Sequence, residues 1–150
     1  MLSQQPFKVP CIRNKGEIEK RVFIVRHAHS LSNQDPKLLT VCSDHTIPLS
    51  DVGLKQASGC SEFLINHLKE DPDFEKRKFL VIISPYKRTR QTADFIVHQL
   101  LQAGANFITK ESIYLSEQQF GLFEGLPLSI LSEKYPYEYS HFEKGFYCKI

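Results

Sequence analysis

A histidine and an arginine stand together where a short apolar run ends. Residues 22–25 read Val-Phe-Ile-Val, and Arg26, His27, Ser30 and Asn33 follow them. An unbroken apolar run of this length is typical of a strand buried on both faces of a parallel sheet, and ligand sites form beyond the carboxyl ends of such strands. The arginine fork fits phosphate oxygens, and a neutral imidazole is able to attack phosphorus. These residues therefore indicate a site for a phosphoryl group.

A second cluster of cations lies at a predicted helix start. Residues 78–83 form another apolar run, and Lys87, Arg88 and Arg90 follow it. A helix N-terminus attracts anions because its first backbone N–H groups have no partner within the helix. One or two of the three cations are expected on a solvated face. Arg88, in the first turn, is the one that we expect to point inward.

Two carboxylates follow the third predicted strand. Glu117 and Glu124 lie in a loop that also contains Gly121 and Gly125, after the weakly alternating residues 106–115. A carboxyl group at a strand end beside a phosphoryl group is able to protonate a leaving alkoxide. Taken alone, the same stretch would indicate only an exposed acidic loop.

The elements that must position these residues alternate along the chain. Residues 1–20 are polar and are expected to form a flexible arm, and a long loop at 28–48 is expected over the site. Strands are predicted at 21–26, 78–83 and 106–115, and helices at about 50–68, 87–103 and 128–135. The apolar stripe of the first helix comprises Val52, Ala57, Cys60, Phe63, Leu64, His67 and Leu68. Strands that alternate with helices imply crossover connections and a parallel, helix-flanked sheet.

Composition narrows the class of protein. A chain of 150 residues with a net charge of only +2 predicts one domain, with no global field to recruit nucleic acid or an acidic membrane. The four cysteines are scattered without a C-x-x-C pair, so buried or free thiols are predicted. We find neither a secretory signal nor an apolar run of about 20 residues, and expect a cytoplasmic location. The sequence does not indicate an oligomeric state.

Four stretches together resemble, in order and spacing, the signatures of the histidine phosphatase superfamily, the phosphoglycerate-mutase-like group. They are Arg26-His27-Ala28-His29-Ser30-x-x-Asn33, Pro48-Leu49-Ser50-x-x-Gly53-x-x-Gln56-Ala57, Ser84-Pro85-x-x-Arg88-x-x-Gln91-Thr92-Ala93 and Leu115-x-Glu117-x-x-x-Gly121-x-x-Glu124-Gly125. Each motif is weak evidence, but the ordered set is specific. The resemblance implies a three-layer α/β/α fold with a mostly parallel central sheet, of which residues 21–150 are the N-terminal portion and the C-terminal part is missing.

The resemblance also implies a role for each candidate residue. His27 would be the nucleophile that becomes phosphohistidine, and Arg26 and Arg88 would hold the phosphoryl oxygens. Glu117 would protonate the leaving group, and Asn33 would help to cradle the phosphate. The substrate would be a small phosphorylated molecule, and no metal or nucleotide cofactor is required.

The chain departs from the family pattern in three places. Ala28 stands where glycine is usual, and His29 replaces the common glutamate. The family also carries a second essential histidine after a further apolar strand, and no segment of this chain matches it; His141 lacks such a strand before it. Loss of that strand would leave an exposed apolar edge on the sheet, so we expect either a fragment or truncated product, or a replacement of the missing strand from elsewhere.

Several functions remain open at this point. A phosphomonoester phosphatase is preferred slightly over a mutase-type phosphotransferase, because no substrate-specific insert is evident. A catalytically degenerate phosphate-binding or regulatory protein would need the same residues. A zinc site built from His27 and His29 with Cys42 or His45 ranks lower, since Arg26 would repel a cation.

Overall fold

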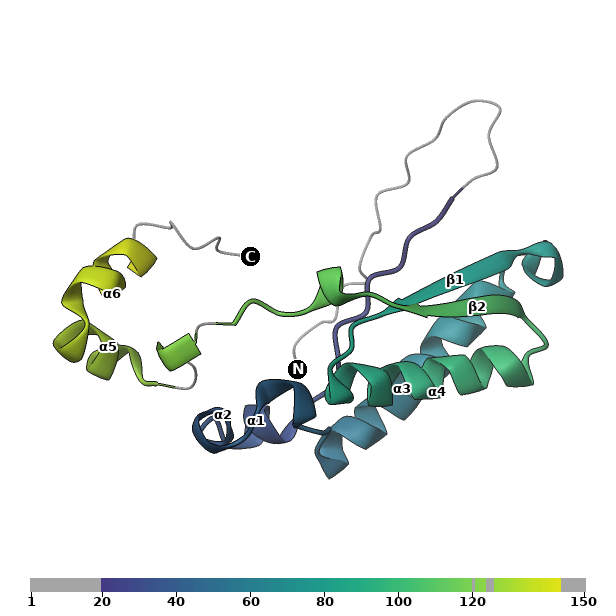
Figure 1. Ribbon diagram of the computed structural model, residues 1–150. Coiled ribbons are helices and arrows are strands. Elements are labelled where there is room, and N and C mark those ends of the chain that lie inside the picture. Colours follow the sequence, from purple (N-terminus) through teal and green to yellow (C-terminus); the bar gives the residue numbers. More distant parts are fainter. Residues whose placement is uncertain (1–19, 120, 124–125, 144–150) are drawn as a thin grey trace, which may run out of the picture.

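The computed structural model of the chain describes residues 20–119, 121–123 and 126–143 (Figure 1). The predicted arm, apart from residue 20, lies outside these ranges, as do Glu124 and Gly125. The described elements are, in chain order, α1 (Leu31–Gln34), α2 (Leu38–Val41), η1 (Asp44–Thr46), α3 (Asp51–Lys69), η2 (Phe74–Lys76), β1 (Lys78–Ile83), α4 (Lys87–Gln102), β2 (Asn106–Glu111), η3 (Ile113–Leu115), η4 (Gly121–Phe123), α5 (Leu128–Lys134) and α6 (Pro136–Glu143).

β1 and β2 form a parallel pair, as the alternation of strands and helices predicted. Lys78 pairs with Asn106 at one end and Ile83 with Glu111 at the other. Helix α4 connects the two strands, because parallel neighbours cannot be joined by a tight turn. The strand predicted at 78–83 is confirmed. The one predicted at 106–115 is confirmed as far as Glu111.

One face of the sheet packs on α3 and α4 (Figure 1). Phe79 and Val81 of β1 contact a buried cluster that contains Ile65, Leu68, Phe74 and Leu100. Because side chains alternate along a strand, Leu80, Ile82 and Ile108 lie on the opposite face, where they are 56%, 50% and 67% exposed. The described residues thus form two layers of an α/β fold, and the third layer is not seen in this part of the chain.

The strand predicted at 21–26 is not formed. Residues 20–29 have no regular secondary structure, and in the described part of the chain β1 pairs with β2 alone. An apolar run becomes a strand only when a neighbour accepts and donates its backbone hydrogen bonds. Val22 and Ile24 are 66% and 94% exposed, whereas Phe23 packs against the core. The chemistry-bearing segment is therefore held by its contacts rather than by a sheet.

The positions of the main helices agree with the prediction, whereas the buried face of α3 differs in part. Helices α3, α4 and α5 occur where they were expected, and Ser50 caps α3 by accepting a hydrogen bond from the backbone of Gly53. The predicted stripe of α3 was partly wrong, since Phe63 is 73% exposed and the buried positions are Gly53, Ala57, Ser61, Ile65 and Leu68. Small residues at the first three of these positions allow close packing. The predicted loop at 28–48 also contains three short helices, α1, α2 and η1.

Helices α5 and α6 pack on each other and stand apart from the sheet (Figure 1). Cys42 and Cys60 are exposed free thiols, and the other two cysteines lie outside the described residues. Among the described residues no helix combines the length and apolar character needed to cross a membrane. The cytoplasmic location stays a prediction.

At Gly53, helix α3 lies in close contact with the backbone of the segment that carries His27. A Cβ atom at Gly53 would overlap the carbonyl oxygen of His29 and lie 2.9 Å from its carbonyl carbon. That oxygen cannot move freely, because it accepts hydrogen bonds from the backbone N and the side-chain hydroxyl of Ser50 at 3.0 and 3.1 Å. Glycine at this position is therefore a packing requirement.

We predict that Gly53→Ala lowers the free energy of unfolding by about 1–3 kcal/mol, the usual range for overpacking. Gly59→Ala is the matched control, because Gly59 is exposed in the same helix and an added Cβ would meet nothing within 4 Å. It should raise the free energy of unfolding by up to about 1 kcal/mol through helix propensity. Urea unfolding of both variants tests this pair, and equal effects would contradict the proposed contact.

Candidate active site

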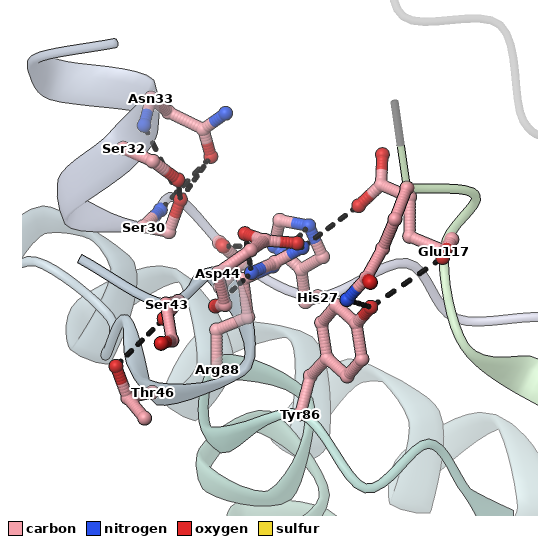
Figure 2. A network of polar contacts seen from close by, with 12 residues as sticks. His27, Ser30, Ser32, Asn33, Ser43, Asp44, Thr46, Tyr86, Arg88 and Glu117 are labelled. Carbon is pink, nitrogen blue, oxygen red and sulfur yellow. Dashed lines mark hydrogen bonds and ion pairs between the residues drawn. The ribbon is translucent and has the colours of Figure 1, made fainter. Parts of the chain in front are cut away.

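Segments far apart in the sequence converge on one small cavity (Figure 2). The cavity encloses about 100 Å³. Its lining consists of Arg26, His27, Ser32, Asn33, Leu39, Asp44, Arg88 and Glu117. All five residues that the sequence singled out therefore lie together, although they come from three separate motifs.

Motif residues that carry no chemistry anchor the segment around His27. The backbone N–H of Ala28 donates to the Thr92 hydroxyl at 3.1 Å, and the N–H of His29 donates to the Gln56 side-chain oxygen at 3.0 Å. The Thr92 hydroxyl in turn donates to the backbone oxygen of Arg88 at 2.9 Å. A single side chain thus connects the histidine segment to the arginine turn. The motif spacing in α3 and α4 supplies these anchors.

The hydrogen bonds of His27 determine which ring nitrogen is available. Nδ1 lies 2.8 Å from the carbonyl oxygen of Ala28, and a carbonyl only accepts, so Nδ1 carries the proton. Nε2 then has a free electron pair, which accepts a hydrogen bond from Arg88 Nε at 3.2 Å. Burial lowers the pKa of His27, and the nearby charges of Arg88 and Arg26 lower it further against the opposing Ala28 hydrogen bond. The imidazole is therefore held neutral, with Nε2 facing the cavity.

Arg88 is the buried cation of the site. Its side chain is 4% exposed, whereas Lys87 and Arg90 on the same helix are exposed. Burial by itself would lower the pKa of Arg88, but hydrogen bonds and charge from Asp44 and Glu117 outweigh it and raise the pKa. The guanidinium is consequently charged at all physiological pH values. The guanidinium also lies over the aromatic ring of Tyr86, with its central carbon 4.9 Å from the ring centroid.

Asp44 is the charged residue of the lining that the sequence did not reveal; Ser32 and Leu39 were not singled out either. It begins η1 and pairs with Arg88 through Oδ1 to Nη1 at 2.6 Å and Oδ2 to Nη2 at 3.1 Å. In the sequence it is one polar residue among many in a loop, and only the fold brings it to Arg88. A buried cation that requires a partner is the signal that would have prompted a search for it.

Glu117 lies at the mouth of the cavity. Its Oε2 accepts a hydrogen bond from Arg88 Nη2 at 2.8 Å, and its side chain is 61% exposed. The Tyr86 hydroxyl braces the loop below it by donating to the Glu117 backbone oxygen at 3.4 Å while accepting from Gln119 at 3.2 Å. The carboxylate is thus aimed inward by Arg88 and still open to solvent.

Asn33 and Arg26 complete the lining. The Asn33 side-chain oxygen caps α1 by accepting from the backbone N–H and the hydroxyl of Ser30, both at 2.9 Å, and its amide nitrogen points away from Ser30 (Figure 2). Arg26 is exposed, and no ion pair to it occurs within the described ranges. Two arginines and two carboxylates therefore line the cavity, and one of the arginines is open to an anion.

The two histidines considered for a zinc site, His27 and His29, do not share the cavity: His27 lies in its lining and His29 does not. His29 Nδ1 contacts the Ser50 hydroxyl at 2.8 Å rather than the cavity. In the part of the chain that the structure describes, no group of three or more His, Cys, Asp or Glu side chains is arranged to hold a metal ion. His29 instead fixes the junction between the histidine segment and α3.

Comparison with known proteins gives a consistent picture. The sequence profile described as "Histidine phosphatase superfamily (branch 1)" matches residues 22–148. Two proteins of Arabidopsis thaliana are similar to the chain. Phosphoglycerate mutase-like protein AT74 is 32% identical over 113 residues, which are 71% of this chain and 34% of that protein. Phosphoglycerate mutase-like protein AT74H is 30% identical over 122 residues, which are 75% of this chain and 41% of that protein.

A solved structure supports the fold alone. It is an Escherichia coli K-12 protein named provisionally as an alpha-ribazole-5'-P phosphatase, and it superposes with a TM-score of 0.54 at 23% sequence identity. The match covers 80% of this chain and 52% of that one. The chain thus spans between about a third and a half of the length of the proteins it matches.

We predict that His27 titrates below its ordinary value of 6.5, and that Arg88→Met raises the pKa of His27 by removing a neighbouring cation. Arg90→Met is the control, because Arg90 lies on the same helix but pairs with Glu111 on the surface. The unfolded chain takes up this proton near pH 6.5 and the folded chain only at lower pH, so His27 lowers stability as the pH falls below 6.5. Histidine NMR titration gives the pKa directly, and a His27 pKa at or above 6.5 would contradict the prediction that His27 is held neutral.

Proposed function

Since the chain belongs to branch 1 of the histidine phosphatase superfamily, we propose that it transfers the phosphoryl group of a small phosphomonoester to His27 and then to water. One observation carries the proposal: the neutral His27 presents its unprotonated Nε2 to the cavity, beside the guanidinium edge of Arg88 that also contacts Glu117. A histidine nucleophile, cations for the phosphoryl oxygens and a proton donor are the groups that this chemistry needs.

The proposed reaction has two steps. The Nε2 electron pair of His27 attacks phosphorus, the P–O bond to the alcohol breaks, and protonated Glu117 supplies a proton to the departing oxygen. Before this attack Arg88 Nε releases Nε2 and donates to a phosphoryl oxygen instead, which frees the electron pair. In the second step water attacks phosphorus, the Glu117 carboxylate takes a proton from that water, and the P–N bond breaks to release inorganic phosphate. Arg26 and the Asn33 amide would hold the remaining phosphoryl oxygens.

Hydrolysis is preferred to a mutase reaction on one observation. A mutase must keep water away from phosphohistidine, whereas the Glu117 side chain is 61% exposed at the cavity mouth. Water therefore has access to the group that would activate it. Two similar proteins are named mutase-like, so transfer of the phosphoryl group to a second substrate hydroxyl, in place of water, is the alternative second step.

A phosphate-binding or regulatory role is the second candidate. Within the described residues His27 is the one histidine in the cavity lining, although the family pattern includes a second. Such a protein would bind phosphate through Arg26 and Arg88 without turnover. The labelling experiment below separates the two functions.

We predict that a radiolabelled phosphomonoester transfers its label to His27, giving an acid-labile, base-stable phosphohistidine. His27→Ala should abolish the label. His98→Ala should retain it, because His98 is exposed on α4 and outside the cavity lining. Bound phosphate without label in the wild type would support the second candidate instead.

We also predict that Glu117→Gln slows labelling according to the leaving group. With an alkyl phosphate the rate should fall by about 10²–10⁴-fold, the usual contribution of a general acid. With p-nitrophenyl phosphate the loss should be much smaller, because that leaving group departs without a proton. Rapid-quench measurement of the label tests this, and equal losses with both substrates would remove Glu117 from the role of acid.

A further inference from the structure

All five N–H donors of Arg88 are engaged. Nε donates to His27, Nη1 to the side chain and the backbone oxygen of Asp44 at 2.6 and 2.9 Å, and Nη2 to Asp44 and Glu117 at 3.1 and 2.8 Å. A guanidinium has five such donors and no others. Three of them are used by Asp44, a residue outside the motifs that carry the family resemblance. Asp44 is therefore the main partner of the buried cation.

The two edges of the guanidinium face different groups (Figure 2). The edge formed by Nη1 and Nη2 holds the two Asp44 carboxylate oxygens. The edge formed by Nε and Nη2 faces His27 Nε2 and Glu117 Oε2. A phosphoryl group between His27 and Glu117 would meet this second edge, so it would not have to displace Asp44. The carboxylate of Asp44 thus contacts the guanidinium edge that His27 Nε2 and Glu117 Oε2 do not share.

Asp44 itself is held firmly. It starts η1, whose end is closed by a hydrogen bond from the backbone of Ile47 to the Asp44 carbonyl oxygen at 3.2 Å, and Ile47 is 3% exposed. The Asp44 side chain is 13% exposed, and that of Arg88 4%. Paired, two-pronged contacts between largely desolvated groups are strong and have a fixed orientation. Rotation of Arg88 would break two or three of them together.

We propose that Asp44 is a positioning residue, which fixes the rotation of Arg88 so that its Nε–Nη2 edge faces the phosphoryl group on His27. This inference rests on the proposed function of the site. Asp44 also opposes the positive charge that attracts an anion. Its removal should therefore weaken orientation while it strengthens binding, and these two effects can be measured separately.

The test is Asp44→Asn. Asparagine has nearly the same shape, and its side-chain oxygen can still accept from Nη1. Its NH2 group, however, cannot accept from Nη2. We expect labelling of His27 by saturating p-nitrophenyl phosphate to slow by about tenfold to a hundredfold, the cost of misplacing a catalytic group by about 1 Å. The Kd of inorganic phosphate should stay the same or decrease. Asp35→Asn is the matched control and should change neither value, since Asp35 is exposed in the same segment and its side chain accepts a hydrogen bond from the Lys37 backbone N–H, outside the cavity lining.

A double-mutant cycle shows whether Asp44 acts through Arg88. In an Arg88→Lys background, Asp44→Asn should cause little further loss of labelling. A full additional loss there, wild-type labelling by Asp44→Asn, or labelling faster than wild type would each overturn the inference. The last result would make Asp44 an obstacle to the substrate. Asp44→Ser, with thermal melting of every variant, repeats the test if the asparagine variant folds poorly.

A structural readout keeps the inference separate from the proposed function. If the wild type forms no phosphohistidine, the proposed function fails, but the orientation of Arg88 can still be determined. A crystal structure of Asp44→Asn should then show the guanidinium turned away from His27 Nε2. An unmoved guanidinium would overturn the role of Asp44 irrespective of activity.

Discussion

A buried guanidinium is the constraint on which this site depends. Arg88 is 3% exposed, and a charge removed from water in this way is tolerated only when its donors are satisfied. The partners that satisfy it are Asp44, Glu117 and His27, which come from three different parts of the chain. The need to pair one cation therefore brings the nucleophile, the carboxylate at the cavity mouth and η1 to within hydrogen-bond distance of a single side chain.

The rest of the local structure maintains this arrangement. Thr92, one helical turn after Arg88, accepts a hydrogen bond from Ala28 and thereby fixes the distance between the histidine segment and α4. Gln91 does the same at the other end of the loop by accepting from the Leu49 backbone at 2.8 Å. The segment that carries His27 is not a strand in the described structure. Side-chain anchors from the helices replace the backbone ladder that would otherwise position it.

The balance of charge also follows from this pairing. Two arginines and two carboxylates line the cavity, but they are not equivalent. Asp44 neutralises Arg88 at the Nη1–Nη2 edge, and Glu117 is the carboxylate that an entering phosphoryl group would meet, with its side chain 61% exposed. The open cation is Arg26. An anion is thus attracted mainly by one arginine and oriented by the other, which separates binding from alignment.

The sequence by itself determined the parallel strand pair, the three main helices, the family and the five candidate residues, because these depend on local periodicity and on fixed spacings. It could not determine whether residues 21–26 form a strand, since a strand exists only when a neighbour pairs with it. It predicted the inward face of α3 only in part, because close packing at Gly53 and Ser61 outweighs the apolar pattern. Only the tertiary structure decided that Asp44 belongs to the site. An aspartate in a polar loop has no local signature, and its function arises from the buried charge that it meets across the fold.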